Sequence, residues 1–152
     1  MNIKALFEAQ NEKNKKIIID NSLSEYKIWA RRHLELHTKI SYLADETNCY
    51  KYWISEEKDG LNKSVIFEKY LSCFSYIISF GIDRKYDTIE EVKIKPNDYC
   101  LSDQFLNLFI DLNDLIISPS EDHYVTLIED FLSLGITLGY SENTIKEEFI
   151  KY

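Results

Sequence analysis

The sequence predicts an all-α fold in which about five to six helices form one bundle. The 152 residues include only 4 glycines and 2 prolines, too few for an all-β chain rich in tight turns. Apolar residues recur at steps of three and four along most of the chain, which is the helical period. Hydrophobic residues make up 45% and charged residues 29%, as in a globular domain. With no internal repeat or linker, residues 1–152 are predicted to be a single domain.

The first half of the chain holds three predicted helices. One spans 2–19, where apolar and polar residues follow one stripe until "DNSLS" interrupts it. A longer helix spans 23–47, again with steps of three and four. The third, 64–80, is apolar nearly all round in "VIFEKYLSCFSYIISFG", so it is expected to be central and buried. Gly81 is expected to form its C-terminal cap.

The second half begins with an irregular part and ends with three helices. Residues 82–100 contain "YDTIEEVKIKPNDYC", which could hold an extended segment. Helices are predicted over 101–117 and 121–138, and either serine of the intervening "SPSEDH" suits the cap of the second helix. A last short helix is predicted after Ser141, whose side chain suits an N-terminal cap.

Charge and composition limit the classes of partner. The net charge of −8 disfavours nucleic acid, because phosphate binding needs a basic surface. The short "KNKK" run is expected to be a solvated helix face. No apolar run approaches the roughly 20 residues of a membrane span, and the N-terminus lacks a signal-peptide core. Three cysteines without CxxC spacing fit reduced thiols in a cytoplasm, and the rich Ile, Lys and Asn usage fits a firmicute or its phage.

Four segments carry a resemblance to a known family. In order along the chain they are "LFEAQNEKNKKI", "YLADETNCYKYW", "FEKYLSCFSYIISFG" and "FLSLGITLGYSENTIKEEFIKY". Together they resemble the dimeric all-α dUTPases, part of the all-α NTP pyrophosphatase group that includes MazG-like enzymes. The resemblance implies a helical dimer that hydrolyses dUTP, and often dUDP, to dUMP with Mg²⁺. The metal ions would be held by an ExxE pair on one helix and an ExxD pair on the next, since positions i and i+3 share a helix face.

The chain departs from the family at these metal positions. The resemblance places the ExxE pair at Lys39 and Tyr42 and the ExxD pair at Lys69 and Ser72, so none of the four is a carboxylate. A histidine that often follows the second pair is replaced by Ser75. At an effective dielectric near 20, an ammonium group about 4 Å from a divalent cation is repelled by about 8 kcal/mol. We therefore expect no metal ligand and no catalytic residue at these positions.

The rest of the family's site is retained. By resemblance, Gln10 and Asn14 match polar positions that contact the base, and Glu46, Lys51 and Trp53 match the remaining motif. These five residues are the predicted nucleotide-binding set. For Gln10 and Asn14 an ordinary solvated helix face is an equal alternative. For Trp53 and the neighbouring tyrosines, core packing at a helix end is favoured over base stacking.

Lys39 and Lys69 admit two interpretations. They are either solvent-facing substitutions, or cations that replace the metal by pairing with acids or by receiving an anion. Positions 35, 39, 42 and 46 form one helical stripe, so a Glu35–Lys39 ion pair is expected.

Two other groups of reactive residues are expected to be structural. His33 and His37 are spaced i, i+4 but have no third ligand, so they are interpreted as ordinary helix histidines. Ser72, Cys73 and Ser75 have no evident base, so they are not expected to be nucleophiles.

Three functional hypotheses follow. The favoured one is an inactive dUTPase-like protein without a cofactor, acting as a binding, regulatory or structural partner in a homodimer or with an active paralogue. The second is a divergent Mg²⁺-dependent dUTP or dUDP pyrophosphatase that uses Glu35, Glu46 and Glu68 as shifted ligands. The third is a metal-free sensor in which Lys39 and Lys69 hold the phosphates of a uracil nucleotide.

Overall fold

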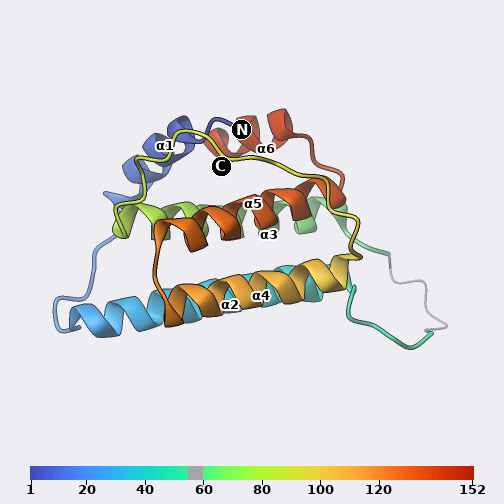
Figure 1. Ribbon diagram of the computed structural model, residues 1–152, viewed down its shortest axis with the longest axis horizontal. Helices are drawn as coiled ribbons and strands as arrows, with labels where there is room; N and C mark the ends of the chain where they lie inside the picture. The colour runs from blue at the N-terminus through green and yellow to red at the C-terminus, as the bar shows by residue number, and fades with distance from the viewer. Residues whose placement is uncertain (55–59) are drawn as a thin grey trace.

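The computed structural model describes residues 1–54 and 60–152, and the described residues form six helices in three layers of two (Figure 1). The layers hold α1 (Lys4–Asn14) beside α6 (Glu142–Lys151), α3 (Lys63–Asp83) beside α5 (Glu121–Thr137), and α2 (Glu25–Thr47) beside α4 (Leu101–Ile117). Helices that share a layer are therefore not consecutive in the chain, whereas α2 with α3 and α4 with α5 pack across layers. The predicted all-α bundle is confirmed.

The middle layer contains the core helix of the bundle. α3 contacts α1, α2, α5 and α6, and Tyr70, Phe74 and Ile77 along it are fully buried. Contrary to the expectation from sequence, α3 is long and apolar enough to cross a membrane by those two criteria alone. Its burial among the other helices is that of a core helix, as the apolar pattern on all its sides predicted.

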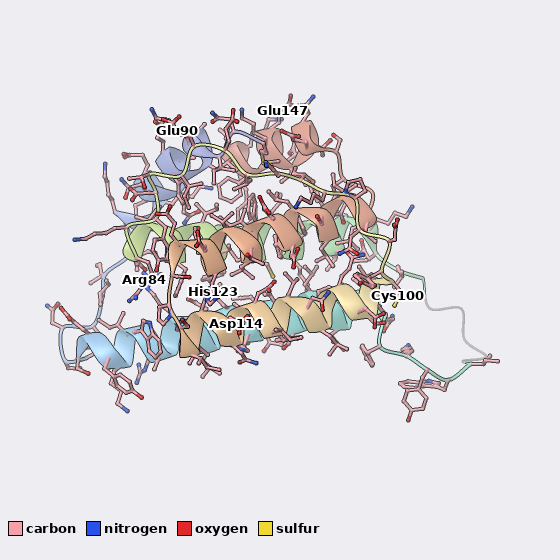
Figure 2. The ribbon with its side chains drawn as sticks, viewed as in Figure 1. Arg84, Glu90, Cys100, Asp114, His123 and Glu147 are labelled. Atoms are coloured by element: carbon pink, nitrogen blue, oxygen red, sulfur yellow. The ribbon has the colours of Figure 1, made fainter. Side chains whose placement is uncertain are left out.

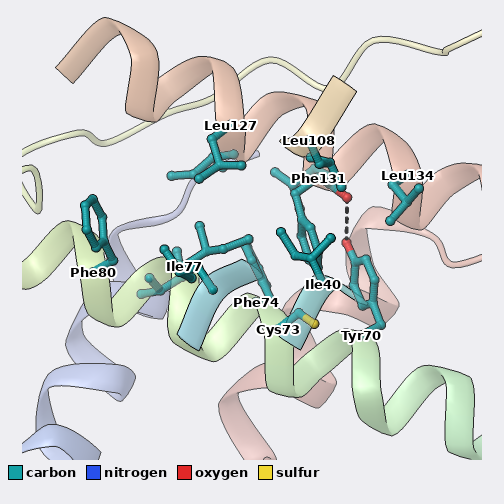
Figure 3. Packing of buried hydrophobic residues seen from close by; sticks show 14 of the residues in the cluster. Ile40, Tyr70, Cys73, Phe74, Ile77, Phe80, Leu108, Leu127, Phe131 and Leu134 are labelled. Carbon is teal, nitrogen blue, oxygen red and sulfur yellow. Dashed lines mark hydrogen bonds between the residues drawn. The ribbon is translucent and has the colours of Figure 1, made fainter. Parts of the chain in front are cut away.

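Two buried tyrosines fix α3 against α5. Tyr70 of α3 lies over Gly135 of α5, and its hydroxyl donates to the carbonyl oxygen of Phe131 at 3.3 Å (Figure 3). In the reverse direction, Tyr124 of α5 lies over Gly81 of α3, where an added Cβ would be 2.0 Å from the tyrosine oxygen. Gly81 is thus not the predicted helix cap: α3 continues past it, and the glycine makes room for the ring.

Three serines begin helices as the capping preference predicts. The side chains of Ser24, Ser120 and Ser141 accept hydrogen bonds from backbone N–H groups in the first turns of α2, α5 and α6. Of the two serines between α4 and α5, Ser120 is the cap. α2 ends where Asn48 adopts a left-handed conformation with φ 54°, which turns the chain away from the bundle.

The connections around α1 differ from the sequence-based expectation. α1 ends at Asn14 rather than at residue 19, because a turn at 15–16 leads into three exposed isoleucines at 17–19. Residues 84–100 run back across the bundle to α4. Of the extended structure expected for this part, the described residues show one isolated antiparallel bridge, between Asn2 and Glu91.

Candidate functional site

The four family metal positions lie on α2 and α3, which pack side by side. Lys39 and Tyr42 come from α2, and Lys69 and Ser72 come from α3. The Lys69 ammonium lies 2.5 Å from Oε2 of Glu46 and donates a hydrogen bond to it. The charge of Glu46, the carboxylate that the motif retains here, is therefore offset by the Lys69 ammonium of the same chain.

Lys39 has a different environment. Its ammonium lies 4.9 Å from the centroid of the Tyr76 ring, as a cation–π contact requires. Burial raises the pKa of Glu35, while Arg32, Lys39 and a hydrogen bond with Tyr76 oppose that rise. Between these described side chains the predicted Glu35–Lys39 ion pair is not formed. Tyr76 of α3 interacts with both side chains: its ring lies under the Lys39 ammonium, and it forms a hydrogen bond with Glu35. Spacing along α2 alone does not reveal this neighbour.

The residues do not fit the Mg²⁺ that the family would place here. Among residues 1–54 and 60–152, no three His, Cys, Asp or Glu side chains are grouped so that they could hold a metal ion. Glu35, Glu46 and Glu68 consequently do not form the shifted ligand set proposed for a divergent enzyme. A divalent cation would also meet the Lys39 and Lys69 ammonium groups.

A polar network links α1 to α3 next to these positions. The amide of Gln10 donates to Asn14 Oδ1 at 2.9 Å, and Ser75 donates to Gln10 Oε1 at 2.7 Å. Ser79 donates to Asn14 Oδ1 at 3.1 Å and receives a hydrogen bond from Arg32 at 3.3 Å. Gln10 is only 5% exposed, so a solvated helix face is the wrong interpretation for this residue.

The network forms the polar side of a pocket of about 590 Å³. Its opposite side is aliphatic and comes from the segment after α1 and the first turns of α2. Neutral hydrogen-bonding groups on one side and aliphatic side chains on the other suit a ligand with a polar, uncharged ring better than a highly charged ligand. The lining residues are Gln10, Asn14, Ile17, Ile19, Leu23, Ile28, Arg31, Arg32, Glu35, Ser75, Tyr76 and Ser79.

The charges at this pocket nearly cancel. Arg32 pairs with Asp83 at 2.6 Å, and burial raises the pKa of that carboxyl while the guanidinium opposes the rise. Arg31 and Glu35 remain on the lining with opposite charges. The pocket therefore has no strong field for a triphosphate without a metal ion.

The comparisons with known proteins bear on the same residues. A model of the dUTPase family matches residues 2–152. The chain belongs to the all-α dUTPase family. The search of curated proteins and the search of solved structures found no match to it. The match spans all six helices, so the resemblance seen in four segments is confirmed for the chain as a whole.

In this dUTPase-family chain, the predicted nucleotide-binding residues fall into two groups. Gln10 and Asn14 line the pocket, whereas Glu46, Lys51 and Trp53 do not. Glu46 is bonded to Lys69, and the other two lie in the segment that leaves the bundle after α2 (Figure 1). The structure thus brings together only part of the predicted set.

The aromatic segment of the dUTPase-family motif is not packed in the core. Tyr52 is 94% exposed and Trp53 is 50% exposed, and their rings meet edge to face at 5.2 Å. The favoured prediction of core packing at the helix end is wrong, because the left-handed turn at Asn48 directs the following residues away from the helices. Tyr50 reaches back to the helix and donates to Asp45 at 3.0 Å.

His33, His37 and Cys73 have defined surroundings within the bundle. His33 is packed between the rings of Trp29 and Phe80, and burial lowers its pKa to about 4. Nδ1 of His37 lies 2.8 Å from the carbonyl oxygen of His33. Burial raises the pKa of the Cys73 thiol to about 12, which makes it a poor nucleophile. None of the three cysteines, all of which the structure describes, forms a disulfide.

Sequence reasoning missed much of the pocket. It indicated Ser75 as the replacement of a histidine and as an unsupported nucleophile, but not as part of a pocket, and it did not indicate Ser79 or Arg32. A signal was present: Gln10 and Asn14 on one helix and Ser75 and Ser79 on an otherwise apolar helix share the i, i+4 spacing. Two polar pairs with matching spacing indicate that their helices face each other along that stripe.

Proposed function

We propose that this member of the dUTPase family is catalytically inactive and acts as a binding or regulatory partner. The observation that carries the proposal is the Lys69–Glu46 ion pair at the family's metal positions. An enzyme of this family needs carboxylates there to bring Mg²⁺ to the phosphates. Here Lys69 places a cation at one of these positions, and Glu46 forms an ion pair with it.

Turnover of dUTP and dUDP in the presence of Mg²⁺ tests this proposal. We expect no release of dUMP above the rate in buffer, while an active all-α dUTPase assayed in parallel serves as the positive control. Mg²⁺-dependent turnover that disappears in the Glu46→Gln variant would overturn the proposal, because it would show that Glu46 still serves a metal. The variant also controls for a contaminating hydrolase, whose activity it would leave unchanged.

The proposed partner is a second copy of the chain, with an active paralogue as the other candidate. The outer faces of α2 and α4 carry the exposed apolar side chains of Leu34, Leu106 and Ile110. Lys27, in the first turn of α2, lies seven residues before Leu34 and so on the same face, and Asp103, in the first turn of α4, lies three residues before Leu106. The two helices begin at opposite ends of their layer (Figure 1). A two-fold axis in the interface, perpendicular to the helices, would place these opposite charges together.

Light scattering with size-exclusion chromatography tests the homodimer. We expect a dimer for the wild type and a monomer for Leu106→Glu, with Lys4→Glu on α1 as a control that leaves the dimer intact. A monomeric wild type would redirect the search to a different partner.

The proposal places the protein in the cytoplasm, because its free cysteines fit a reducing compartment.

A second candidate function is metal-free binding of a uracil nucleotide. The pocket of about 590 Å³ and its Gln10–Asn14–Ser75–Ser79 network favour it. The phosphates would depend mainly on Lys39, because Lys69 is already paired.

Isothermal titration with dUMP and dUTP, with Mg²⁺ and again with EDTA, tests this candidate. Binding that survives EDTA and weakens in Lys39→Glu would support it. Binding only with Mg²⁺ would instead show that a metal site survives, and the absence of binding in both conditions would leave the protein-interaction role.

A further inference from the structure

Two carboxyl groups meet inside the α4–α5 pair, away from the pocket. Asp111 of α4 is 8% exposed, and no hydrogen-bond donor reaches its buried Oδ2 from the described part of the chain. Gln104 of α4 donates to Thr137 of α5 at 3.0 Å, and seven residues further along each of these antiparallel helices Asp111 and Asp130 face each other. An ionised carboxylate only accepts hydrogen bonds, so a hydrogen bond between the two carboxyls requires a proton on one of them.

The surroundings favour retention of that proton. Burial raises the pKa of Asp111 to about 7, and the charges of Asp130 and Asp114 add to the rise, while His123 opposes it. Figure 2 labels Asp114 and His123 where α4 and the start of α5 come together. α2, on the other side of α4, faces it with the ring of His37, which stacks on Phe109.

Asp130 lies beside the segment that precedes α4. Burial also raises the pKa of Asp130, with Glu129 adding to the rise and Lys95 opposing it. Residues 93–95 of that segment are held on α5 by two bonds. Ser133 donates to the Lys95 carbonyl at 2.6 Å, and the backbone N–H of Lys93 donates to Glu129 at 3.0 Å.

We propose that Asp111 and Asp130 form a proton-dependent lock between α4 and α5. With one proton bound, the two carboxyls share a hydrogen bond across the buried interface. When that proton leaves, two negative charges face each other at a buried site and oppose the packing of the two helices. Because Asp130 adjoins residues 93–95, opening of the lock also weakens the attachment of that segment.

The direction of the pH dependence follows from the raised pKa. Between the ordinary carboxyl value of 3.8 and about 7, the folded protein binds a proton that the unfolded chain has lost. The contribution of the pair to stability therefore falls as the pH rises through this range and stays low above it. An asparagine at position 111 donates to Asp130 without a titrating proton, so it removes this dependence.

Thermal unfolding of the full chain between about pH 5 and about pH 8 tests the lock. We expect the midpoint of Asp111→Asn to exceed that of the wild type by a margin that grows as the pH rises. Glu8→Gln, which changes an exposed carboxylate on α1, should keep the wild-type profile. If Asp111→Asn does not fold, Asp130→Asn provides the same comparison. Parallel profiles for wild type and variant would overturn the proposal.

Two further readouts distinguish a proton lock from a cation site. Hydrogen exchange of α4, α5 and residues 93–95, corrected for the intrinsic pH effect, should show less protection at pH 8 than at pH 6 in wild type but not in Asp111→Asn. Unchanged protection of the wild type would contradict the proposed opening. If added Ca²⁺ or Mg²⁺ abolishes the pH dependence of the wild type alone, the pair is a cation site, and the proton lock is refuted.

Discussion

The ammonium group of Lys69 lies 2.5 Å from Oε2 of Glu46 and joins α3 to α2. The family resemblance assigns a metal-binding carboxylate to the position that Lys69 occupies. Opposite charges supplied by the chain itself can hold two helices together, but they leave no open coordination position for a metal ion bound to phosphate. The same contact thus supports the fold and argues against the family's chemistry.

Loss of this pair should affect stability slightly and hydrolysis not at all. In Glu46→Gln, the partly exposed Lys69 ammonium loses its partner, and we expect a loss of unfolding free energy of about 0.5–1 kcal/mol. Urea unfolding measures it, and Glu148→Gln, which breaks the exposed pair with Lys151, provides a control without measurable change. A loss several times larger would mean that Glu46 has further buried partners.

The tyrosine–glycine contact between α3 and α5 should tolerate no added methyl group. In Gly135→Ala the new Cβ would lie 2.3 Å from the Tyr70 hydroxyl oxygen, so the ring or a helix must move. We expect a destabilisation of about 1–3 kcal/mol in urea unfolding, as for other overpacked cores. Gly60→Ala is the matched control, since its Cβ would meet no atom within 4 Å. Equal stabilities of the two variants would contradict the tight packing.

The polar network should contribute to stability whether or not a ligand binds. Gln10→Leu removes the side-chain amide, which donates to Asn14 and accepts from Ser75, and leaves the Ser75 hydroxyl without its acceptor. We expect a loss of about 1–3 kcal/mol, the cost of a buried polar group left unpaired. The double variant with Ser75→Ala should recover part of that loss, because both polar partners are then gone. Urea unfolding of the double-mutant cycle measures the coupling, and an additive result would show that the bond is unimportant.

His33 should make the fold sensitive to acid. Burial lowers its pKa from 6.5 to about 4, so the unfolded chain binds a proton in this range that the folded protein does not. The contribution of this residue to stability is therefore present above about pH 6.5 and is lost as the pH falls towards 4. His33→Phe removes two ring nitrogens that have no partner in the described residues and should raise the midpoint at pH 4.5 more than at pH 7.

The His33 measurement has an internal comparison. His37→Gln, which changes the partly buried histidine one turn further along α2, is measured at the same two pH values. A gain for His33→Phe that is the same at both pH values would show that packing, and not protonation, is responsible. The dependence runs opposite to that of the Asp111–Asp130 pair, so each is best measured as a difference from wild type.

Most of the fold was predictable because its signals are local. The period of apolar residues located all six helices, and the serine caps at Ser120 and Ser141 gave the starts of α5 and α6. The errors occur where a partner distant in sequence decides. Gly81 continues a helix because Tyr124 lies over it, and Trp53 is exposed because the chain turns outward at Asn48.

The candidate site was predictable only in part. Family resemblance indicated Gln10 and Asn14, which line the pocket, and assigned the metal positions to four residues that are not carboxylates. It did not indicate that Lys69 would pair with Glu46, or that Lys39 would lie over Tyr76. Spacing along one helix predicts which residues of that helix are neighbours, whereas each of these two contacts joins α2 to α3.

The sequence by itself determined the helices, their buried faces and the family. Each of these depends on residue type and on spacing over a few turns, which the chain carries locally. Only the tertiary structure decided which side chains meet: Lys69 with Glu46, Gln10 with Ser75, and Asp111 with Asp130. Such contacts depend on how helices far apart in the sequence align when their apolar faces are buried together, and this alignment also sets the protonation of the groups that meet.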